Sequence, residues 1–170
     1  MMERVNEILS HPLYQEYYEK LEKIEEDRIF CRHQMSHLLD VARIAYIQNL
    51  EQNHGFSKEV IYAAAILHDF GKCEQYENKT PHEIAGENVA RKILLDLNEQ
   101  WTNQEELHFT EDEVTMILSA IRNHRREADA KNVLYQLLYV SDKLSRNCFT
   151  CPAEAQCNWS EEKKNRGVVI

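Results

Sequence analysis

The stretch from residue 61 to residue 72, which reads IYAAAILHDFGK, constrains the fold more than any other part of the chain. Ile61 and Ala64 fall at helical spacing, and the same inward face continues to His68, which Asp69 follows. A buried imidazole or carboxylate without a partner costs on the order of several kcal/mol. Both groups must therefore be hydrogen bonded or bind a charged species, of which a metal ion is one.

The composition favours a single helical domain. The chain has 170 residues, enough for one core without disulfides, and only four glycines and three prolines, which favours long helices. A net charge of −9 argues against an extended nucleic-acid groove. The longest apolar run, residues 60–67, is too short to cross a bilayer, and the chain starts without an apolar signal segment. We expect one all-α domain over residues 1–170, cytoplasmic and without membrane contact; an oligomer is compatible with the sequence but not indicated by it.

Helical periodicity and capping residues predict a compact bundle of about six or seven helices. The residues between the Gly71 stop signal and the Thr80-Pro81 start signal read as an exposed loop. Thr110 and Glu113 form a capping-box pattern at the start of another helix. The other expected helices cover residues 3–9, 12–27, 33–53, 58–69, 82–98 and 129–146.

Polar residues occur at other positions that the helical period assigns to the core. The apolar stripe of the helix after Thr110 continues to His124, and that of the last helix continues to Asp142. His37 lies on an apolar flank, and His82 lies in a first helical turn. Each has an ordinary explanation as a satisfied core or boundary residue, but their joint occurrence favours a metal centre. Imidazole and carboxylate ligands suit iron, manganese, zinc, cobalt or nickel.

The order of these residues resembles the HD-domain superfamily of metal-dependent phosphohydrolases. The H…HD…D pattern is formed by His37, the His68-Asp69 pair and Asp142. The local contexts HLLDVARIA, AAILHDFGK, PHEIAGENVARKIL and YVSDKLSR match as well. The resemblance covers about residues 30–147 and implies the HD-domain helical bundle, which leaves residues 148–170 as a cysteine-containing C-terminal extension.

The resemblance also implies the metal ligands. His37, His68, Asp69 and Asp142 would bind one metal ion. His82 and His124 match positions that hold a second ion in some members, with Asp69 bridging the two. We therefore favour a binuclear centre of iron or manganese over a mononuclear one, with zinc, cobalt and nickel also compatible.

The implied activity is hydrolysis of a small phosphoester or phosphoanhydride by a metal-activated hydroxide. A stand-alone domain with this ligand pattern is similar to the branch that cleaves dinucleoside polyphosphates, so we expect a phosphorylated small molecule, a nucleotide above all. Asp69 and Lys72 are the candidate catalytic residues, although Lys72 also fits an ordinary cation at a helix end. The alternative function is a catalytically silent sensor that binds a metal or nucleotide and has a redox- or metal-responsive cysteine cluster. A purely structural helical protein is a third.

Three further residues are candidate substrate contacts. Arg125 and Arg126 follow His124 and could neutralise a phosphate, although a solvated pair at a helix end is the commoner arrangement. His33 shares a helical side with His37, so it either supports the ligands and contacts substrate or lies on the surface.

The C-terminal extension contains a cysteine cluster, formed by Cys148, Cys151 and Cys157 with C-x2-C-x5-C spacing. The first pair has the spacing of one half of a tetrahedral thiolate site. A fourth ligand would come from Cys31, Cys73 or a histidine. The cluster therefore predicts either a second metal site, for zinc or an iron–sulfur cluster, or packing and redox-active thiols.

Overall fold

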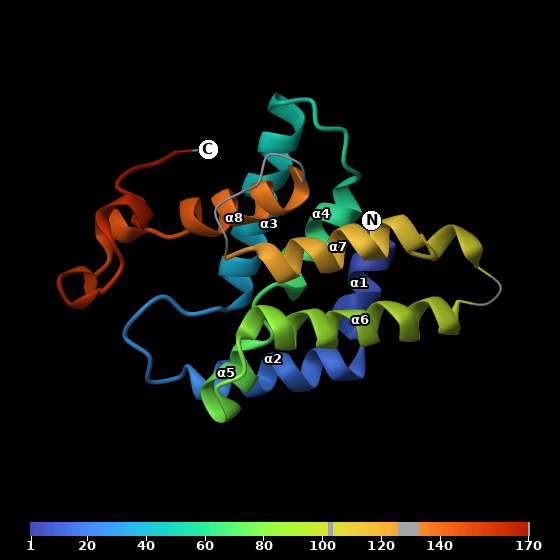
Figure 1. Ribbon diagram of the computed structural model, residues 1–170, viewed down its shortest axis with the longest axis horizontal. Coiled ribbons are helices and arrows are strands. Elements are labelled where there is room, and N and C mark those ends of the chain that lie inside the picture. Colours follow the sequence, from blue (N-terminus) through green and yellow to red (C-terminus); the bar gives the residue numbers. More distant parts are fainter. Residues whose placement is uncertain (102–103, 126–132, 170) are drawn as a thin grey trace.

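A computed structural model describes residues 1–101, 104–125 and 133–169 of the chain, and these residues form helices and no strands (Figure 1). The expected all-α bundle is therefore confirmed. Its α-helices are α1 (Glu3–Ser10), α2 (Pro12–Ile24), α3 (Met35–Glu51), α4 (Lys58–Leu67), α5 (Lys72–Asn78), α6 (His82–Gln100), α7 (Glu111–Asn123) and α8 (Val133–Leu144). Short 3-10 turns follow α6 and α8: η1 (Glu105–Leu107), η2 (Cys148–Thr150), η3 (Glu154–Gln156) and η4 (Glu161–Lys163).

Helix α4 is the centre of the core. Every residue from 60 to 67 is buried, because α4 packs against α1, α3, α7 and α8 and has no face left for solvent. The helix begins where the Ser57 hydroxyl accepts a hydrogen bond from the Val60 amide at 3.2 Å. It ends at Leu67, two residues earlier than the sequence suggests. His68 and Asp69 thus lie in the turn that leaves the core helix.

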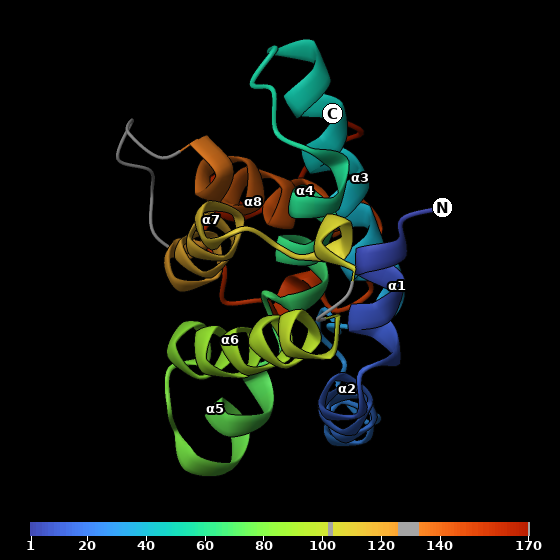
Figure 2. The same cartoon turned by 90° about the vertical axis from the view of Figure 1, so that its right-hand side faces the viewer.

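The remaining helices surround that turn. Helix α3 packs against both α4 and α8, and α6 packs against α7. In both views α6 runs between α7 on one side and α2 with α5 on the other (Figures 1 and 2). The C-terminal ends of α4, α7 and α8 lie in one region with the first turns of α3 and α6. No helix in the described part of the chain is long and apolar enough to cross a membrane.

The segment after Gly71 was expected as an exposed loop, and this prediction is wrong, because residues 72–78 form α5. A side chain at Gly71 would place a Cβ atom 1.9 Å from the His82 carbonyl oxygen, so only glycine permits this close approach to α6. The polar sequence of α5 has no apolar period. The helix instead depends on packing against α2 and α6, including a Lys20–Glu77 ion pair of 2.6 Å.

Two expected helix boundaries differ in ways that affect the site. Helix α3 begins at Met35 rather than at residue 33, so His33 lies in the irregular segment before it. The last helix is described from Val133, and the expected residues 129–132 lie outside the described ranges. The capping box of Thr110 and Glu113 at the start of α7 is confirmed.

Candidate metal centre

Four histidines and two aspartates from five separate elements meet at the end of α4. All six are at most 9% exposed. His37 comes from the first turn of α3, the His68-Asp69 pair from the turn after α4, and His82 begins α6. His124 directly follows α7, and Asp142 lies in the second half of α8. The structure thus brings together all six histidines and aspartates that the sequence proposes as metal ligands.

One group within this cluster consists of His37, His68, Asp69 and Asp142, whose ligand atoms all lie within 4.8 Å of one another. The Nε2 atom of His37 lies 3.5 Å from Oδ2 of Asp69 and 3.4 Å from Oδ1 of Asp142. The Nε2 atom of His68 lies 3.0 Å from Oδ2 of Asp69. One cation at the centre of the group would be within reach of two imidazoles and two carboxylates.

A second group consists of Asp69, His82 and His124. The Nε2 atoms of the two histidines are 3.1 Å apart, and Oδ1 of Asp69 lies 3.5 Å from that of His82 and 3.8 Å from that of His124. Asp69 therefore directs Oδ2 toward the first group and Oδ1 toward the second. This is the orientation that a bridging carboxylate requires.

The hydrogen bonds made by Nδ1 determine which ring nitrogen of His68 and of His124 faces the centre of the cluster. Nδ1 of His68 lies 2.6 Å from the Ala65 carbonyl oxygen, and Nδ1 of His124 lies 2.6 Å from the Ile121 carbonyl oxygen. A carbonyl oxygen only accepts, so each Nδ1 carries the hydrogen. In the neutral ring, Nε2 then directs its lone pair inward, as a metal-ligating histidine does.

The same arrangement holds for the other two histidines. The Ser145 hydroxyl donates to the Asp142 carbonyl at 2.8 Å and so accepts from Nδ1 of His37 at 3.0 Å. Gln75 Oε1 accepts from Nδ1 of His82. All four rings are thus oriented from outside, with Nε2 directed to the centre.

Three atoms at the centre lack hydrogen-bond partners among the described residues: Nε2 of His37, Nε2 of His68 and Oδ2 of Asp69. The last two are 3.0 Å apart but do not have hydrogen-bond geometry. An unsatisfied buried polar atom costs about 1–3 kcal/mol. A divalent cation would satisfy all three, and the mixed nitrogen and oxygen ligands suit iron, manganese or zinc. The residues present therefore fit a metal centre.

The electrostatics of the cluster also favour a cation. Burial opposes a charge on His68, but Asp69 and Asp142 outweigh it and raise the pKa of His68 to about 10. The same two carboxylates would stabilise a metal ion that replaces this proton. Burial likewise opposes ionisation of Asp142, yet Arg146 keeps the pKa of this carboxyl well below its usual range. Burial lowers the pKa of His124 to about 4, which keeps its ring neutral. Ionised carboxylates and a neutral imidazole are the protonation states that bind metals.

His33 is buried beside Asp69, a position that its helical spacing from His37 did not predict. It is 4% exposed, so the surface alternative is wrong, and its Nε2 lies 3.6 Å from Oδ2 of Asp69. Glu25, which the sequence interpretation missed, accepts hydrogen bonds from the His33 amide at 2.7 Å, from its Nδ1 at 2.6 Å and from the Tyr76 hydroxyl at 2.6 Å. Glu25 follows α2 four residues after the buried Leu21, so it continues the buried stripe of Tyr14 and Leu21, a signal that the sequence interpretation did not use.

A cavity of about 530 Å³ reaches the cluster, and Asp69, His82, His124 and Asp142 line its inner end. Lys72 lies beside it, and burial lowers the pKa of its ammonium group. Cationic side chains along the cavity include Arg28, Lys72, Arg125, Lys143, Arg146 and Lys163. The cavity is thus rich in positive charge, although the chain carries a net charge of −9.

Most of the arginines and cysteines that the sequence predicts for a site line this cavity. Arg125 lines the cavity and pairs with Glu83 at 2.9 Å, whereas Arg126 lies outside the described residues. The three predicted cysteines line the same cavity, together with Cys31. Cys73 lies apart, with its sulfur 3.4 Å from the Tyr17 carbonyl oxygen.

Comparisons with known proteins find sequence relatives for most of this chain. The family model described as HD domain matches residues 35–147. An uncharacterized protein from Clostridium beijerinckii is 45% identical over 96% of this chain and 97% of its own length. Ribonuclease Y from Acetivibrio thermocellus and from Oleidesulfovibrio alaskensis are each 24% identical over 79% of this chain, which spans 22% of those enzymes. No solved structure matches the chain.

Proposed function

Because this chain belongs to the HD domain family, we propose that it is a metal-dependent phosphohydrolase with a binuclear centre that cleaves a small phosphoester or phosphoanhydride. The single observation that carries the proposal is the orientation of Asp69. Its two carboxylate oxygens face two separate groups of inward-directed imidazole nitrogens, at 3.0 Å from His68 on one side and 3.5 Å from His82 on the other.

The residues around this centre have separate roles in the proposal. His37, His68 and Asp142 would hold one cation with Asp69, and His82 and His124 would hold the other. Iron or manganese is favoured; zinc, cobalt and nickel accept similar ligands. When bound, such cations supply Lewis acidity and an activated water near neutral pH. Lys72, within the same cavity, would neutralise a phosphoryl or leaving-group oxygen.

The cavity supports a phosphorylated small molecule as the substrate. A volume of about 530 Å³ is in the range of small-ligand pockets, and its cationic lining suits several phosphate charges. Phe30 and Trp159 line the same cavity and offer apolar faces to a nucleobase. We therefore favour a nucleotide. The names of the ribonuclease Y relatives support phosphodiester chemistry, but a net charge of −9 disfavours a long RNA groove here.

The test is metal analysis and turnover measured on one sample. Protein purified without added metal is expected to contain about two transition-metal ions per chain at the imidazole and carboxylate ligands, as two ligand groups imply. The same sample should release phosphate or a nucleotide from a panel of nucleotides and aryl phosphoesters. Asp69→Asn should abolish turnover and the metal bound at these ligands, whereas Asp112→Asn, which changes an exposed carboxylate in α7, should preserve both. Tight nucleotide binding without turnover, with iron, manganese or zinc supplied, would instead identify the silent sensor.

A further inference from the structure

The C-terminal extension, residues 148–170, of which the structure describes 148–169, is attached to the domain without an apolar core of its own. Among the described residues, the hydrophobic core cluster contains none beyond Leu138. The buried residues of the extension are Cys148, Ala153 and Asn165, and its regular structure is limited to the short turns η2, η3 and η4. Something other than apolar packing must therefore hold most of this segment in place.

The polar contacts of the extension hold it only weakly to the rest of the domain. Lys164 pairs with Glu154 and Glu161 at 2.8 Å each, but both partners belong to the extension itself. The two glutamate side chains are 34% and 70% exposed, so solvent screens both ion pairs and they contribute little. The Asn165 side chain does reach the domain, where it donates to the Leu144 carbonyl at 2.8 Å. Small segments that cannot bury a core are commonly held by disulfides or bound metals.

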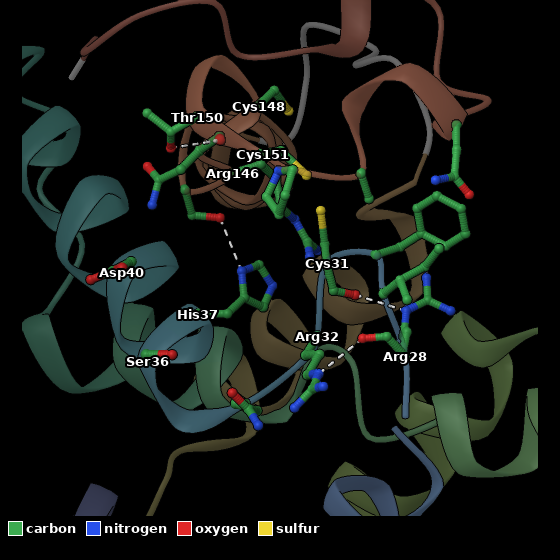
Figure 3. A pocket seen from close by; sticks show the side chains of 18 of the residues that line it. Arg28, Cys31, Arg32, Ser36, His37, Asp40, Arg146, Cys148, Thr150 and Cys151 are labelled. Carbon is green, nitrogen blue, oxygen red and sulfur yellow. Dashed lines mark hydrogen bonds between the residues drawn. The ribbon is translucent and has the colours of Figure 1, made fainter. Parts of the chain in front are cut away.

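Four of the five cysteines gather where the extension meets the domain. Cys31 comes from the irregular segment before α3, and Cys148, Cys151 and Cys157 come from the extension; all four line the cavity that reaches the candidate metal centre. Figure 3 shows another pocket, which shares the lining residues Cys31, Cys148, Cys151 and Arg146 with this cavity. None of these cysteines forms a disulfide.

Local contacts place Cys31, Cys148 and Cys151 near one another. The Cys151 amide donates to the Cys148 carbonyl at 3.2 Å, so the η2 turn brings the two ends of the C-x2-C pair together. Burial raises the pKa of the Cys31 thiol, Arg146 opposes the rise, and the nearby Cys148 and Cys151 thiols add to it. Among the described residues, no three of these sulfur atoms lie within 4.8 Å of one another, so a metal would have to draw the set together.

We propose that Cys31, Cys148, Cys151 and Cys157 form a four-thiolate site for a thiophilic metal that fastens the C-terminal extension to the segment before α3. A zinc ion and an iron–sulfur cluster share this ligand chemistry. The site is separate from the imidazole and carboxylate cluster, because neither ligand group of that cluster contains a cysteine.

Arg146 connects the two sites. Its guanidinium donates to Oδ1 of Asp142 at 2.7 Å, lies 5.9 Å from the Trp159 ring and interacts electrostatically with Cys31. A metal on the thiolates would therefore hold the extension, Trp159 included, against one wall of the substrate cavity.

The test measures metal content and thiol reactivity of the full chain purified under anaerobic conditions. The wild type is expected to contain one zinc ion, or iron with inorganic sulfide and cluster absorbance, in addition to the metal of the imidazole site. Cobalt(II) supplied to metal-free protein should produce a thiolate charge-transfer band. Cys148→Ser should lose this metal and the band, and Cys157→Ser provides a second variant if the first does not fold.

Two controls make the outcome specific. Cys73→Ser should retain the thiolate-bound metal, because Cys73 does not line the shared cavity. Asp69→Asn should retain it as well, even if that variant binds nothing at the imidazole site, which separates this proposal from the proposed phosphohydrolase activity. Wild-type protein that shows no cobalt charge-transfer band, contains no thiolate-bound metal and leaves Cys31, Cys148, Cys151 and Cys157 free to react with a thiol reagent would overturn the proposal.

Discussion

The Nε2 atoms of His82 and His124 face each other at 3.1 Å inside the protein, and each ring is held by a hydrogen bond at Nδ1. Both Nδ1 atoms contact acceptors, so the two inward nitrogens of the neutral rings carry lone pairs. Such a pair is favourable when a proton or cation is shared between the nitrogens. Burial lowers the pKa of His82 to about 2 and that of His124 to about 4. A proton shared between the two nitrogens is therefore disfavoured at neutral pH, and a bound metal cation is the favoured way to stabilise the pair.

The first prediction concerns the second ligand group. His82→Ala should lower the metal content by about one ion per chain, because His37, His68, Asp69 and Asp142 remain in place. Elemental analysis of the isolated variant measures this. His54→Ala, in the loop after α3 and outside both groups, is the matched control. A His82→Ala protein that retains both ions would contradict the two-group assignment.

The second prediction concerns Lys72. Lys72→Met keeps much of the length of the side chain but removes the charge that faces the cavity. We expect kcat/KM for phosphate release to fall about ten- to a hundredfold, with metal content unchanged, because the cation would stabilise charge on the phosphoryl group. Lys92→Met changes an exposed lysine of α6 and should leave the kinetics unaltered. Equal kinetics for both variants would show that Lys72 is an ordinary cation at a helix end.

The third prediction concerns Glu25 and pH. Burial opposes its ionisation, but hydrogen bonds from His33 and Tyr76 outweigh this and lower the pKa of Glu25 from 4.5 to about 2. A carboxyl with a lowered folded-state pKa contributes stability that is complete above its unfolded-state pKa and is lost as the pH falls toward the folded-state value. The contribution should therefore be present at pH 6 and decline between pH 4.5 and pH 2.

Urea unfolding of wild type and Glu25→Gln, both in excess chelator, measures this contribution. At pH 6 we expect the variant to be less stable by on the order of 3 kcal/mol, from 1.36 kcal/mol per pKa unit. The difference should shrink at pH 3. Glu26→Gln, the exposed neighbour, should show no such change. A wild-type advantage that stays constant from pH 6 to pH 3 would mean that Glu25 does not ionise as described.

The fourth prediction concerns Gly71. An added Cβ would lie 1.9 Å from the His82 carbonyl oxygen and 2.4 Å from the Gly86 amide nitrogen, so Gly71→Ala must push α6 away from the turn after α4. We expect a loss of about 1–3 kcal/mol in unfolding free energy and weaker metal binding at His82. Gly167→Ala meets no atom within 4 Å and serves as the control. Thermal unfolding and metal titration of the two variants check the expectation.

Sequence periodicity predicted much of the helical fold because most long helices bury one regular face. Residues 60–67 read as a continuous apolar run and are all buried in α4. Helix α5 was missed because its polar sequence has no such face and depends on contacts with α2 and α6. The start of α3 was misplaced for a related reason: His33 and His37 have helical spacing, but Glu25 holds His33 outside the helix through its main-chain amide.

The sequence by itself determined the family, the all-α class and the six candidate ligands, because a histidine or aspartate on an apolar stripe needs a partner wherever the helices lie. It could not determine which of these residues form each group. Only the tertiary structure decided that Asp69 faces both groups, that Glu25 and Ser145 orient histidines, and that Cys31 lies with the cysteines of the extension. These relationships join residues far apart in the chain, and the packing of helices around the HD turn at His68-Asp69 sets their distances.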